Sequence, residues 1–444
     1  MRLLKVGAAT LNQTPLDWAN NQSNILSAIQ EAQEQGVSIL CLPELCITGY
    51  GCEDTFLSPS VLRTSLEVVK EIIPASKRLI VNVGLPIRYK NAIFNTACLL
   101  CDGKKAGFTA KRHLARSGIH YEPRWFQGWA KGKDAQLTLD GDIYPLGDVH
   151  FDCGGIRIGF EICEDAWVAD RPGGGLSLDG VDVIMNPSAS HFAFGKHAVR
   201  ERFVLEASRA FGVTYLYSNM LGNEAGRAIY DGGAMVASCG RLDAVTERFS
   251  FKSCEIATAT IDLDQTRLGQ AVSANSSETP REGTSHCISS NFQYPAVPVS
   301  QTGLEVANWE HIEKLKEEEF SRAVSLGLFD YLRKSKSKGF VVSLSGGADS
   351  SAVTCLVAIM INLAVKQLGV NVFKKRLAHI QNLTAEDTRG LIKQLLTCVY
   401  QSTRNSSEDT KKSASGLALA LGAEFLEFDV DLLVENYQEI VTAS

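Results

Sequence analysis

Short apolar segments alternate with amphipathic segments through the sequence, and this alternation restricts the possible folds more than any other feature. Residues 4–10 and 37–42 are predicted as buried strands, and residues 18–35 between them carry apolar side chains at helical spacing. The other helices predicted in this part are 60–73 and 197–210, and the other strands are 79–85, 93–101, 156–160, 181–185, 213–218, 229–237 and 253–261. Such an order predicts an α/β layered fold in which functional groups gather at strand ends.

Two domains are predicted, because 444 residues exceed one ordinary hydrophobic core. Between residues 272 and 307, serine and proline replace the periodic pattern, which is typical of a linker. A helical pattern then covers 308–334, with a solvated face predicted at Glu313, Lys314, Lys316 and Glu317 to Glu319. We therefore expect a first domain at 1–271, a linker at 272–307 and a second domain at 308–444.

The composition argues against several classes of function. A net charge of −6 disfavours general affinity for nucleic acid or for an anionic membrane. No apolar run reaches the roughly 18 to 20 residues of a membrane-spanning helix, and the amino terminus lacks a secretory signal. The twelve cysteines are scattered, which favours reduced thiols and a cytoplasmic location over a disulfide framework. Their spacing does not predict a zinc site.

The segment from Gly159 to Trp167 places a cysteine where a strand gives way to a turn. Cys163 follows the β-branched residues Ile156 and Ile158 and precedes two acidic residues. Catalytic nucleophiles are often presented at such strand ends. Cysteine is also among the residues most often buried as a small apolar side chain. The position alone therefore leaves both interpretations open.

A glycine-rich loop opens the second domain. An apolar strand runs into Ser345-Gly346-Gly347, and a helix is predicted from about Asp349 to Val365. Glycines bring backbone N–H groups close to an anion, and the amino end of the helix adds a favourable dipole, so the loop is suited to phosphate. It differs from the loop of kinases and GTPases because no lysine follows the glycines. The alternative is a plain turn with Asp349 as a helix cap.

Three segments of the first domain together resemble the nitrilase, or carbon–nitrogen hydrolase, superfamily. They are Leu42-Pro-Glu-Leu45, Lys111 with Leu114, and Phe160-Glu-Ile-Cys-Glu-Asp165. The resemblance implies an α-β-β-α sandwich with a catalytic triad of Glu44, Lys111 and Cys163. A carboxylate with a raised pKa can take the thiol proton, and an ammonium can stabilise the oxyanion. A second glutamate is common near the lysine in this family, and Glu122 is the candidate.

The glycine-rich loop resembles the pyrophosphatase loop of enzymes that activate a substrate by adenylation with ATP. The resemblance implies a Rossmann-like α/β domain. The positions that it implies for ATP binding are Ser345, Gly346, Gly347, Asp349, Ser350 and Ser351. Asp349 would also help to hold Mg²⁺. The motif indicates the adenylating chemistry and does not name the acceptor acid.

The order of the two domains resembles the glutamine-dependent NAD synthetase family, as do Cys163-Glu-Asp-Ala-Trp167 and Arg404-Asn-Ser-Ser407. These enzymes are ATP-dependent ligases with glutamine as amido donor. The resemblance implies that ammonia released from glutamine passes through an internal channel and amidates adenylated deamido-NAD, giving NAD, glutamate, AMP and pyrophosphate. It also implies a homo-oligomer, and contacts from Glu164, Ser190 and Lys196 to the amino and carboxylate groups of glutamine.

Two departures from the family pattern bear on these expectations. Leu114-Ala115 replaces the usual Leu-Pro after the lysine, which affects the shape of the following loop. Family members also continue beyond the length of this chain, so we expect the second domain to be incomplete at its C-terminal end. Three alternatives stay open: a stand-alone amidase with a nucleotide-sensing second domain, an inactive scaffold, and an amidotransferase for another acid.

Overall fold

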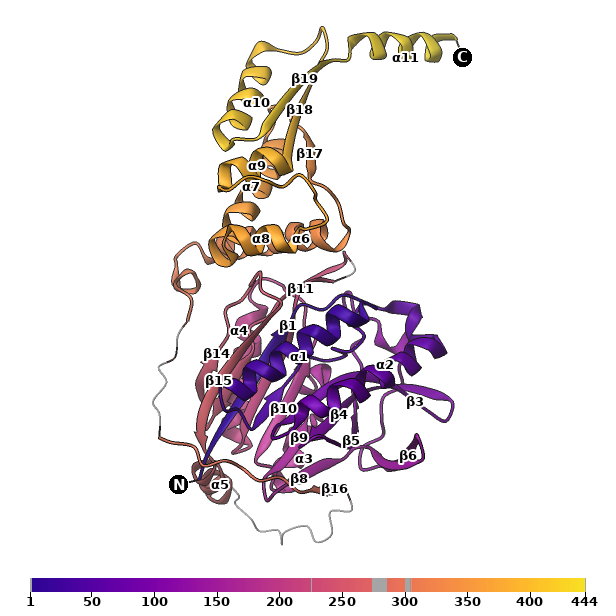
Figure 1. Cartoon of the computed structure of the whole chain (residues 1–444), viewed down its shortest axis with the longest axis vertical. Helices are drawn as coiled ribbons and strands as arrows, with labels where there is room; N and C mark the ends of the chain where they lie inside the picture. The colour runs from indigo at the N-terminus through magenta and orange to yellow at the C-terminus, as the bar shows by residue number, and fades with distance from the viewer. Residues whose placement is uncertain (1, 225, 274–285, 300–303, 305, 444) are drawn as a thin grey trace. The chain divides into compact units, whose positions relative to one another are not determined.

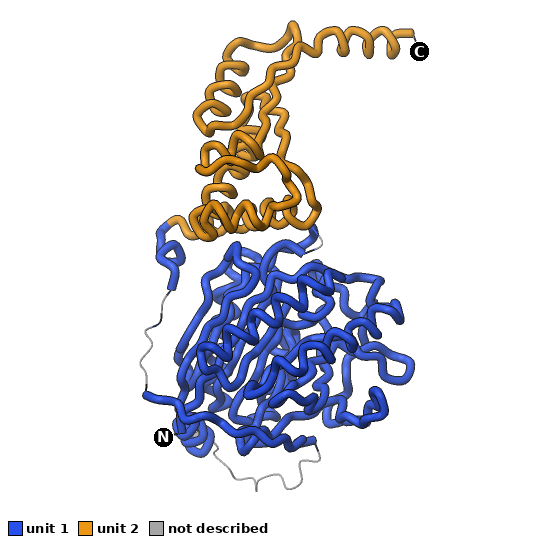
Figure 2. Tube along the Cα trace, in the orientation of Figure 1, with its two compact units in different colours: residues 1–313 blue, residues 314–444 orange. Residues whose placement is uncertain are grey.

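A computed structural model describes residues 2–224, 226–273, 286–299, 304 and 306–443. The chain divides into two compact units, Met1–Glu313 and Lys314–Ser444, each with its own sheet and helices (Figures 1 and 2). The predicted linker, 272–307, belongs to the first unit by this division. Its described part contains strand β16 (Cys287–Ser290), which pairs in parallel with β8 (His150–Cys153).

The first unit is built on one sixteen-stranded sheet. Its longest path runs β16-β8-β9-β10-β11-β1-β2-β3-β4-β5-β7-β6, and β15 pairs with β1 along its whole length. The remaining strands are β1 (Leu3–Leu11), β2 (Ile39–Cys41), β3 (Ile80–Tyr89), β4 (Ala92–Cys101), β5 (Lys104–Ala110), β6 (Asp134–Leu139), β7 (Asp142–Gly147), β9 (Arg157–Phe160), β10 (Val183–Ser188), β11 (Thr214–Glu224), β12 (Ala228–Asp231), β13 (Met235–Ser238), β14 (Arg241–Val245) and β15 (Cys254–Asp262). The helices are α1 (Trp18–Glu34), α2 (Pro59–Ile72), α3 (Pro172–Leu178), α4 (Lys196–Ala210) and α5 (Leu263–Ser273).

The sheet curls so that its two halves enclose a shared apolar layer. On β1, Leu4, Val6 and Ala8 point into this layer, where they join side chains of β9, β10 and β15. The alternate residues Ala9 and Leu11 belong to a second cluster with α1 and α2. A third cluster packs α4 and α3 against β11 and β13. Helices therefore cover both outer faces, and the predicted α-β-β-α sandwich is confirmed (Figure 1).

The predicted segments correspond to real elements, and the differences have local causes. The strand predicted at 229–237 is broken into β12 and β13, because Gly232 and Gly233 between them have φ of +70° and +73°. Strands β6 and β7 were not predicted, since their exposed and polar residues weaken the apolar pattern. Helix α5 lies beyond the last predicted strand and was also missed.

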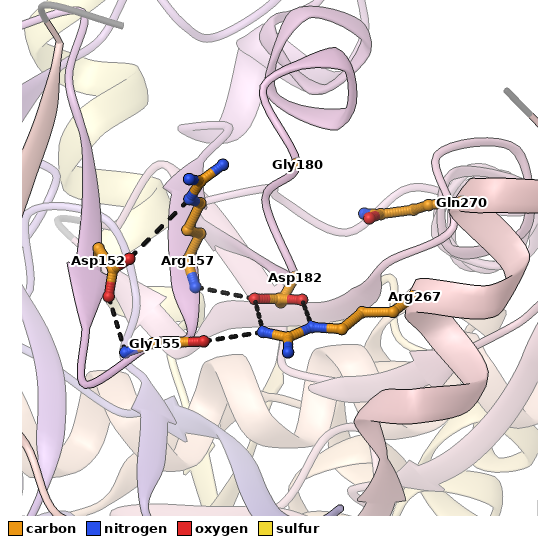
Figure 3. Close-up of a pocket in the computed structure, with 7 residues that line it drawn as sticks. All are labelled: Asp152, Gly155, Arg157, Gly180, Asp182, Arg267 and Gln270. Atoms are coloured by element: carbon orange, nitrogen blue, oxygen red, sulfur yellow. Dashed lines mark hydrogen bonds and ion pairs between the residues drawn. The ribbon is translucent and has the colours of Figure 1, made fainter. Parts of the chain in front are cut away.

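A cluster of polar contacts, shown in Figure 3, anchors helix α5 to the sheet. Arg267 donates to both carboxylate oxygens of Asp182, at 2.7 and 2.9 Å, and to the carbonyl of Gly155 at 2.8 Å. Gln270 donates to the carbonyl of Val181 at 2.7 Å. Gly155, Asp182, Arg267 and Gln270 line a hollow of about 320 Å³. The paired charges indicate that this cluster anchors the helix.

The second unit contains a three-stranded parallel sheet in the order β17-β18-β19. Its elements are α6 (Leu315–Lys334), β17 (Phe340–Ser343), α7 (Ala348–Leu368), α8 (Val370–Arg376), α9 (Thr388–Leu395), β18 (Leu396–Ser402), α10 (Glu408–Leu421), β19 (Glu424–Asp429) and α11 (Asp431–Ala443). The helix predicted at 308–334 is divided into a short 3-10 helix, η5 (Asn308–His311), and α6. Glu319, predicted to be solvated, is buried on α6. The parallel α/β order confirms the predicted fold class of this part.

By length and composition alone, α7 is the one helix in the described chain that could cross a membrane, so the expectation that no apolar run is long enough was wrong. The helix directly follows the glycine-rich loop. Its residues Val357, Met360 and Ile361 are buried within the unit. This position and packing are those of a core helix in an α/β domain.

Candidate active site

Three predicted residues of the first unit meet in one buried cluster. Lys111 Nζ donates to Glu44 Oε1 at 2.6 Å and to Glu122 Oε1 at 2.8 Å. All three side chains are almost completely buried. Glu44 follows β2, Lys111 follows β5, and Glu122 lies in the 3-10 helix η3 (Glu122–Arg124). The structure therefore brings the ends of separate elements together. From the sequence alone, Lys111 could equally have been a charged residue on the surface.

Gly84 allows the Glu44 turn to lie directly against β3. A Cβ at this position would come within 2.2 Å of the backbone nitrogen of Leu45. The carbonyl of Gly84 accepts a hydrogen bond from Ile47 at 3.1 Å, which fixes the same turn. A side chain here would displace Glu44 from the cluster.

The electrostatics of the cluster suit a carboxylate base next to a permanent cation. Burial raises the pKa of Glu44 to about 7, and the charge of Lys111 limits the rise. Burial alone would lower the pKa of Lys111, but the two carboxylates hold it well above its ordinary value. Glu44 can therefore gain and lose a proton near neutral pH while Lys111 stays charged.

Cys163 is presented by a strained turn beside this cluster. It follows β9, begins the 3-10 helix η4 (Cys163–Ala166), and has φ of +49°, a left-handed conformation that is uncommon for a non-glycine residue. Burial and the charge of Glu44 raise the pKa of its thiol, whereas Lys111 and the N–H of Ala189 lower it. The thiol is therefore protonated at rest and needs a base.

Several supporting residues were not predicted. Asn95 donates to Glu44 Oε1 at 2.8 Å, and the N–H of Ala189 donates to Glu44 Oε2 at 3.1 Å. Tyr50 donates to Glu122 Oε1 at 2.8 Å. No local pattern distinguishes these residues from ordinary strand and loop positions, because their role depends on contacts between distant parts of the chain.

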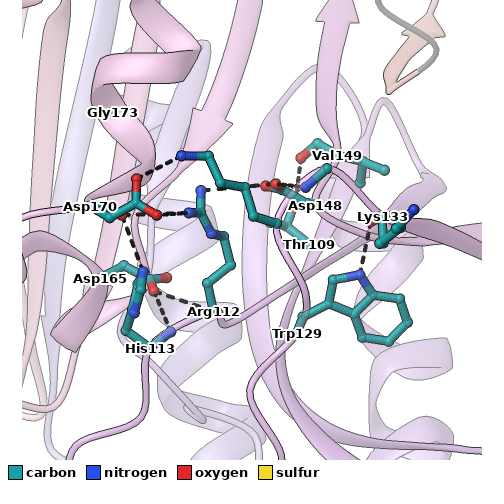
Figure 4. A network of polar contacts seen from close by, with 12 residues as sticks. Thr109, Arg112, His113, Trp129, Lys133, Asp148, Val149, Asp165, Asp170 and Gly173 are labelled. Atoms are coloured by element: carbon teal, nitrogen blue, oxygen red, sulfur yellow. Dashed lines mark hydrogen bonds and ion pairs between the residues drawn. The ribbon is translucent and has the colours of Figure 1, made fainter.

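Asp165 joins the cysteine turn to the lysine loop, as Figure 4 shows for the loop side. Its Oδ1 accepts from the backbone N–H groups of Arg112 and His113, at 3.2 and 2.8 Å. Its Oδ2 accepts from the N–H of Ile162 at 3.0 Å. One buried carboxylate therefore fixes the residues that flank both Lys111 and Cys163. The sequence contained this signal in the acidic pair after the cysteine.

We expect Asp165→Asn to lower kcat for glutamine hydrolysis about ten- to hundredfold with KM within about twofold. An amide can accept on one side only, so a buried N–H loses its partner, which costs about 1–3 kcal/mol. Asp170→Asn is the matched control, because Asp170 contacts the same loop through Arg112 but is largely exposed. Steady-state kinetics of both variants test this. Equal effects of the two substitutions would contradict a positioning role for Asp165.

The three residues implied for glutamine binding lie around the cysteine turn. Glu164 follows Cys163 directly and is partly exposed. Ser190 is buried in the loop that follows β10, and its Oγ has no hydrogen-bond partner among the described residues. Lys196 begins α4, and burial lowers the pKa of its ammonium group, while the nearby Cys163 and Glu164 limit the fall. The arrangement is compatible with the predicted contacts, which stay predictions.

Two histidines that the sequence analysis did not predict as site residues lie near Lys196. Nδ1 of His191 is 3.3 Å from Lys196 Nζ and 2.9 Å from His120 Nε2. Burial lowers the pKa of His120 to about 3 and that of His191 to about 4. Both rings are therefore neutral at pH 7, and Nδ1 of His191 lies within hydrogen-bond distance of both Lys196 Nζ and His120 Nε2.

The pKa of Glu44 predicts the pH dependence of the first unit. Glu44 must be ionised to take the thiol proton, so kcat/KM for glutamine hydrolysis should fall about tenfold per pH unit below pH 7 and level off above it. A pH–rate profile between pH 5 and 9 measures this. A profile that is flat across pH 7 would show that Glu44 is not the base.

The glycine-rich loop of the second unit has the open form that an anion site needs. Gly346 has φ of +79°, and a Cβ on it would lie 2.5 Å from the carbonyl oxygen of Thr410. Gly347 is the N-cap of α7, and no described side chain caps the helix there. Asp349 lies within the first turn of α7, so it is not the helix cap that the alternative interpretation required.

Hydroxyl groups gather around this loop. Ser345 Oγ and Ser350 Oγ are 3.1 Å apart, and Ser351 Oγ donates to the carbonyl of Gly347 at 2.7 Å. All the residues predicted to bind ATP therefore lie at the carboxyl end of β17, the edge where open α/β sheets bind ligands. Their contacts with ATP stay predictions.

A sandwich of this type with a buried glutamate, lysine and cysteine defines a carbon–nitrogen hydrolase, and the family profile of that name, "Carbon-nitrogen hydrolase", matches residues 5–270. A second profile, "NAD synthase", matches residues 320–444. The crystal structure of a glutamine-dependent NAD(+) synthetase from Cytophaga hutchinsonii is similar over 99% of this chain and 67% of its own, with 41% identity and a TM-score of 0.82. The chain belongs to the glutamine-dependent NAD(+) synthetase family.

Curated relatives agree with this assignment. The glutamine-dependent NAD(+) synthetases of Mus musculus and Oryza sativa subsp. indica are 34% and 33% identical over 98% of this chain. The chain spans 62% and 61% of their lengths. A structure of the Acinetobacter baumannii enzyme, in complex with ADP, has a TM-score of 0.70 at 18% identity and shows the shared fold.

Proposed function

We propose that the full-length protein makes NAD from deamido-NAD, ATP and glutamine. The observation that carries this proposal is the buried Glu44–Lys111–Glu122 cluster beside Cys163, in one chain with an open phosphate loop. The first unit hydrolyses glutamine, and the second unit consumes the ammonia. The family relatives support the same pairing of activities.

The reaction in the first unit begins with attack of Cys163 on the side-chain amide of glutamine. Glu44 takes the thiol proton as the bond between sulfur and carbon forms. The negative oxygen of the tetrahedral intermediate is stabilised by Lys111 and by the backbone N–H after Cys163. Glu122 keeps Lys111 charged and in place through their 2.8 Å contact.

Collapse of this intermediate breaks the carbon–nitrogen bond. Glu44 returns its proton to the nitrogen, ammonia leaves, and a thioester remains on Cys163. Glu44 then takes a proton from water, which attacks the thioester and releases glutamate and the free thiol. Glu164, Ser190 and Lys196 hold the amino and carboxylate groups of the substrate during both steps.

The second unit binds ATP at the loop from Ser345 to Ser351. Backbone N–H groups and hydroxyls hold the phosphates, and the carboxylate of deamido-NAD is activated as an adenylate with release of pyrophosphate. Asp349, a single carboxylate beside hydroxyls, fits Mg²⁺, which takes most of its ligands from phosphate and water. Bound there, the ion would neutralise phosphate charge. Ammonia reaches the adenylate through a protein channel and displaces AMP.

The proposal also includes the oligomeric state and the cellular location of the protein. We expect a homo-oligomer, since the family resemblance implies one, and a cytoplasmic location. All twelve cysteines are free, and most are buried, which agrees with a reducing compartment.

A steady-state assay of the full-length protein tests the proposal directly. NAD should form from deamido-NAD and ATP with either glutamine or ammonium as nitrogen source, with one pyrophosphate released per NAD. Glutamate release without any NAD from either source would support a stand-alone amidase. Release of neither glutamate nor NAD would support an inactive scaffold.

A further inference from the structure

Ala189 contacts the catalytic cluster, and the next residue, Ser190, belongs to the predicted glutamine site; we call these two residues the pocket wall. The N–H of Ala189 orients Glu44 at 3.1 Å. Ser190 is fixed at both backbone groups by Asn219: its N–H donates to Asn219 Oδ1 at 2.8 Å, and its carbonyl accepts from Asn219 Nδ2 at 3.1 Å. The position of this wall therefore affects the base and the substrate together.

A buried ion network supports the pocket wall from behind. Arg200 of α4 is fully buried, donates to the carbonyl of Ser190 at 3.4 Å and forms an ion pair with Asp231 Oδ2. Arg248 approaches the same oxygen at 3.6 Å. Asp231 Oδ1 has no hydrogen-bond partner within the described residues. Two arginines therefore share one oxygen of a single carboxylate.

Glu310 supplies the second carboxylate. Arg248 Nε lies 3.0 Å from each of its oxygens, and Arg248 Nη2 donates to Glu310 Oε2 at 2.5 Å. The guanidinium also lies over the rings of Phe249 and Trp309, at 5.2 and 5.0 Å. Arg248 therefore contacts both Asp231 and Glu310, and Asp231 also contacts Arg200. Glu310 belongs to η5, immediately before the second unit begins at Lys314.

We propose that Glu310 is a positioning residue of the glutaminase site, which acts through Arg248, Asp231 and Arg200 on the pocket wall. The inference rests on the proposed function of the first unit and adds a residue outside the carbon–nitrogen hydrolase match, which ends at 270. Any displacement of η5 by the chain that follows it would change glutamine hydrolysis by this route.

The charge balance gives the direction of the effect. Without a negative charge at Glu310, Arg248 is drawn closer to Asp231 and competes with Arg200 for the shared oxygen. Arg200 then loses the ion pair that holds it against the carbonyl of Ser190. Ser190 shifts, and glutamine binds less tightly. Replacing Arg248 by an uncharged side chain of similar length removes the competitor and should restore the Arg200 pair.

Three variants of the full-length protein test this proposal: Glu310→Gln, the double variant Glu310→Gln with Arg248→Met, and Glu313→Gln as a control. Glu313 is exposed and only three residues further along the chain. In Glu310→Gln, kcat/KM for glutamine hydrolysis should fall about tenfold, mainly through KM. In the double variant, kcat/KM should return to within about twofold of the value for the unmodified protein. Glu313→Gln should have the same kcat/KM as the unmodified protein. Ammonium-supported NAD synthesis should stay unchanged in all three.

A purely structural role for Glu310 would not produce rescue by a second substitution. The proposal would be overturned if Glu310→Gln and Glu313→Gln had equal glutaminase activity. It would also be overturned if the double variant had no higher glutaminase activity than Glu310→Gln. Both outcomes presuppose that the unmodified protein hydrolyses glutamine. Absence of that activity would instead contradict the proposed function.

Discussion

Cys163→Ala should abolish glutamine-supported NAD synthesis, by at least about 10³-fold, and leave ammonium-supported synthesis within about twofold. The substitution removes the atom that forms the thioester and changes little in the surrounding packing. Free ammonia bypasses the first unit, so the adenylating unit keeps its nitrogen source. Initial rates with saturating glutamine, and separately with ammonium, give the two values.

Cys239→Ala is the matched control for this experiment. Cys239 also has a left-handed backbone, with φ of +52°, but it is exposed, whereas Cys163 is buried. It should retain both activities. Equal loss of the two activities in Cys163→Ala would contradict the division of labour between the units.

Gly346→Ala should have the opposite effect, with loss of NAD synthesis from either nitrogen source by at least about 100-fold and retention of glutamine hydrolysis. A methyl group there would lie 2.5 Å from the carbonyl of Thr410, at a φ of +79° that disfavours any side chain. The loop would have to move, and its N–H groups would no longer converge on phosphate. Pyrophosphate release and glutamate release, measured in parallel, separate the two steps.

Gly416→Ala provides the control, because Gly416 lies on α10, the helix that carries Thr410, and a Cβ there has no neighbour within 4 Å. It should keep both activities and stabilise the helix by about 0.5–1 kcal/mol. Retention of ATP-dependent synthesis in Gly346→Ala would show that this loop does not bind the phosphates.

The sequence predicted the parts of the site that carry a local pattern. Cys163 and Gly346 each stand at the end of an apolar segment, and Glu44 follows one as well, so strand-end reasoning placed them. The resemblance to a family then gave Lys111 and Glu122 their roles. The structure adds that Glu44, Lys111 and Glu122 share one buried cluster.

The parts that escaped prediction depend on contacts between distant segments. Asn95 orients Glu44 across 51 positions of sequence, and Arg248 reaches Glu310 across 62. A single Asn or Arg has no periodicity, so its partner cannot be read from the chain. Asp165 was visible as part of a motif, but its three backbone partners became evident only once both turns were placed.

The transfer of nitrogen between the two units is tested most directly with glutamine labelled with ¹⁵N in its side-chain amide. The full-length protein is supplied with this glutamine, ATP, deamido-NAD and an excess of unlabelled ammonium, and the NAD is analysed by mass spectrometry. We predict that the carboxamide of NAD carries the ¹⁵N label, with one glutamate and one pyrophosphate formed per NAD. NAD whose carboxamide matches the unlabelled ammonium would contradict transfer through the protein.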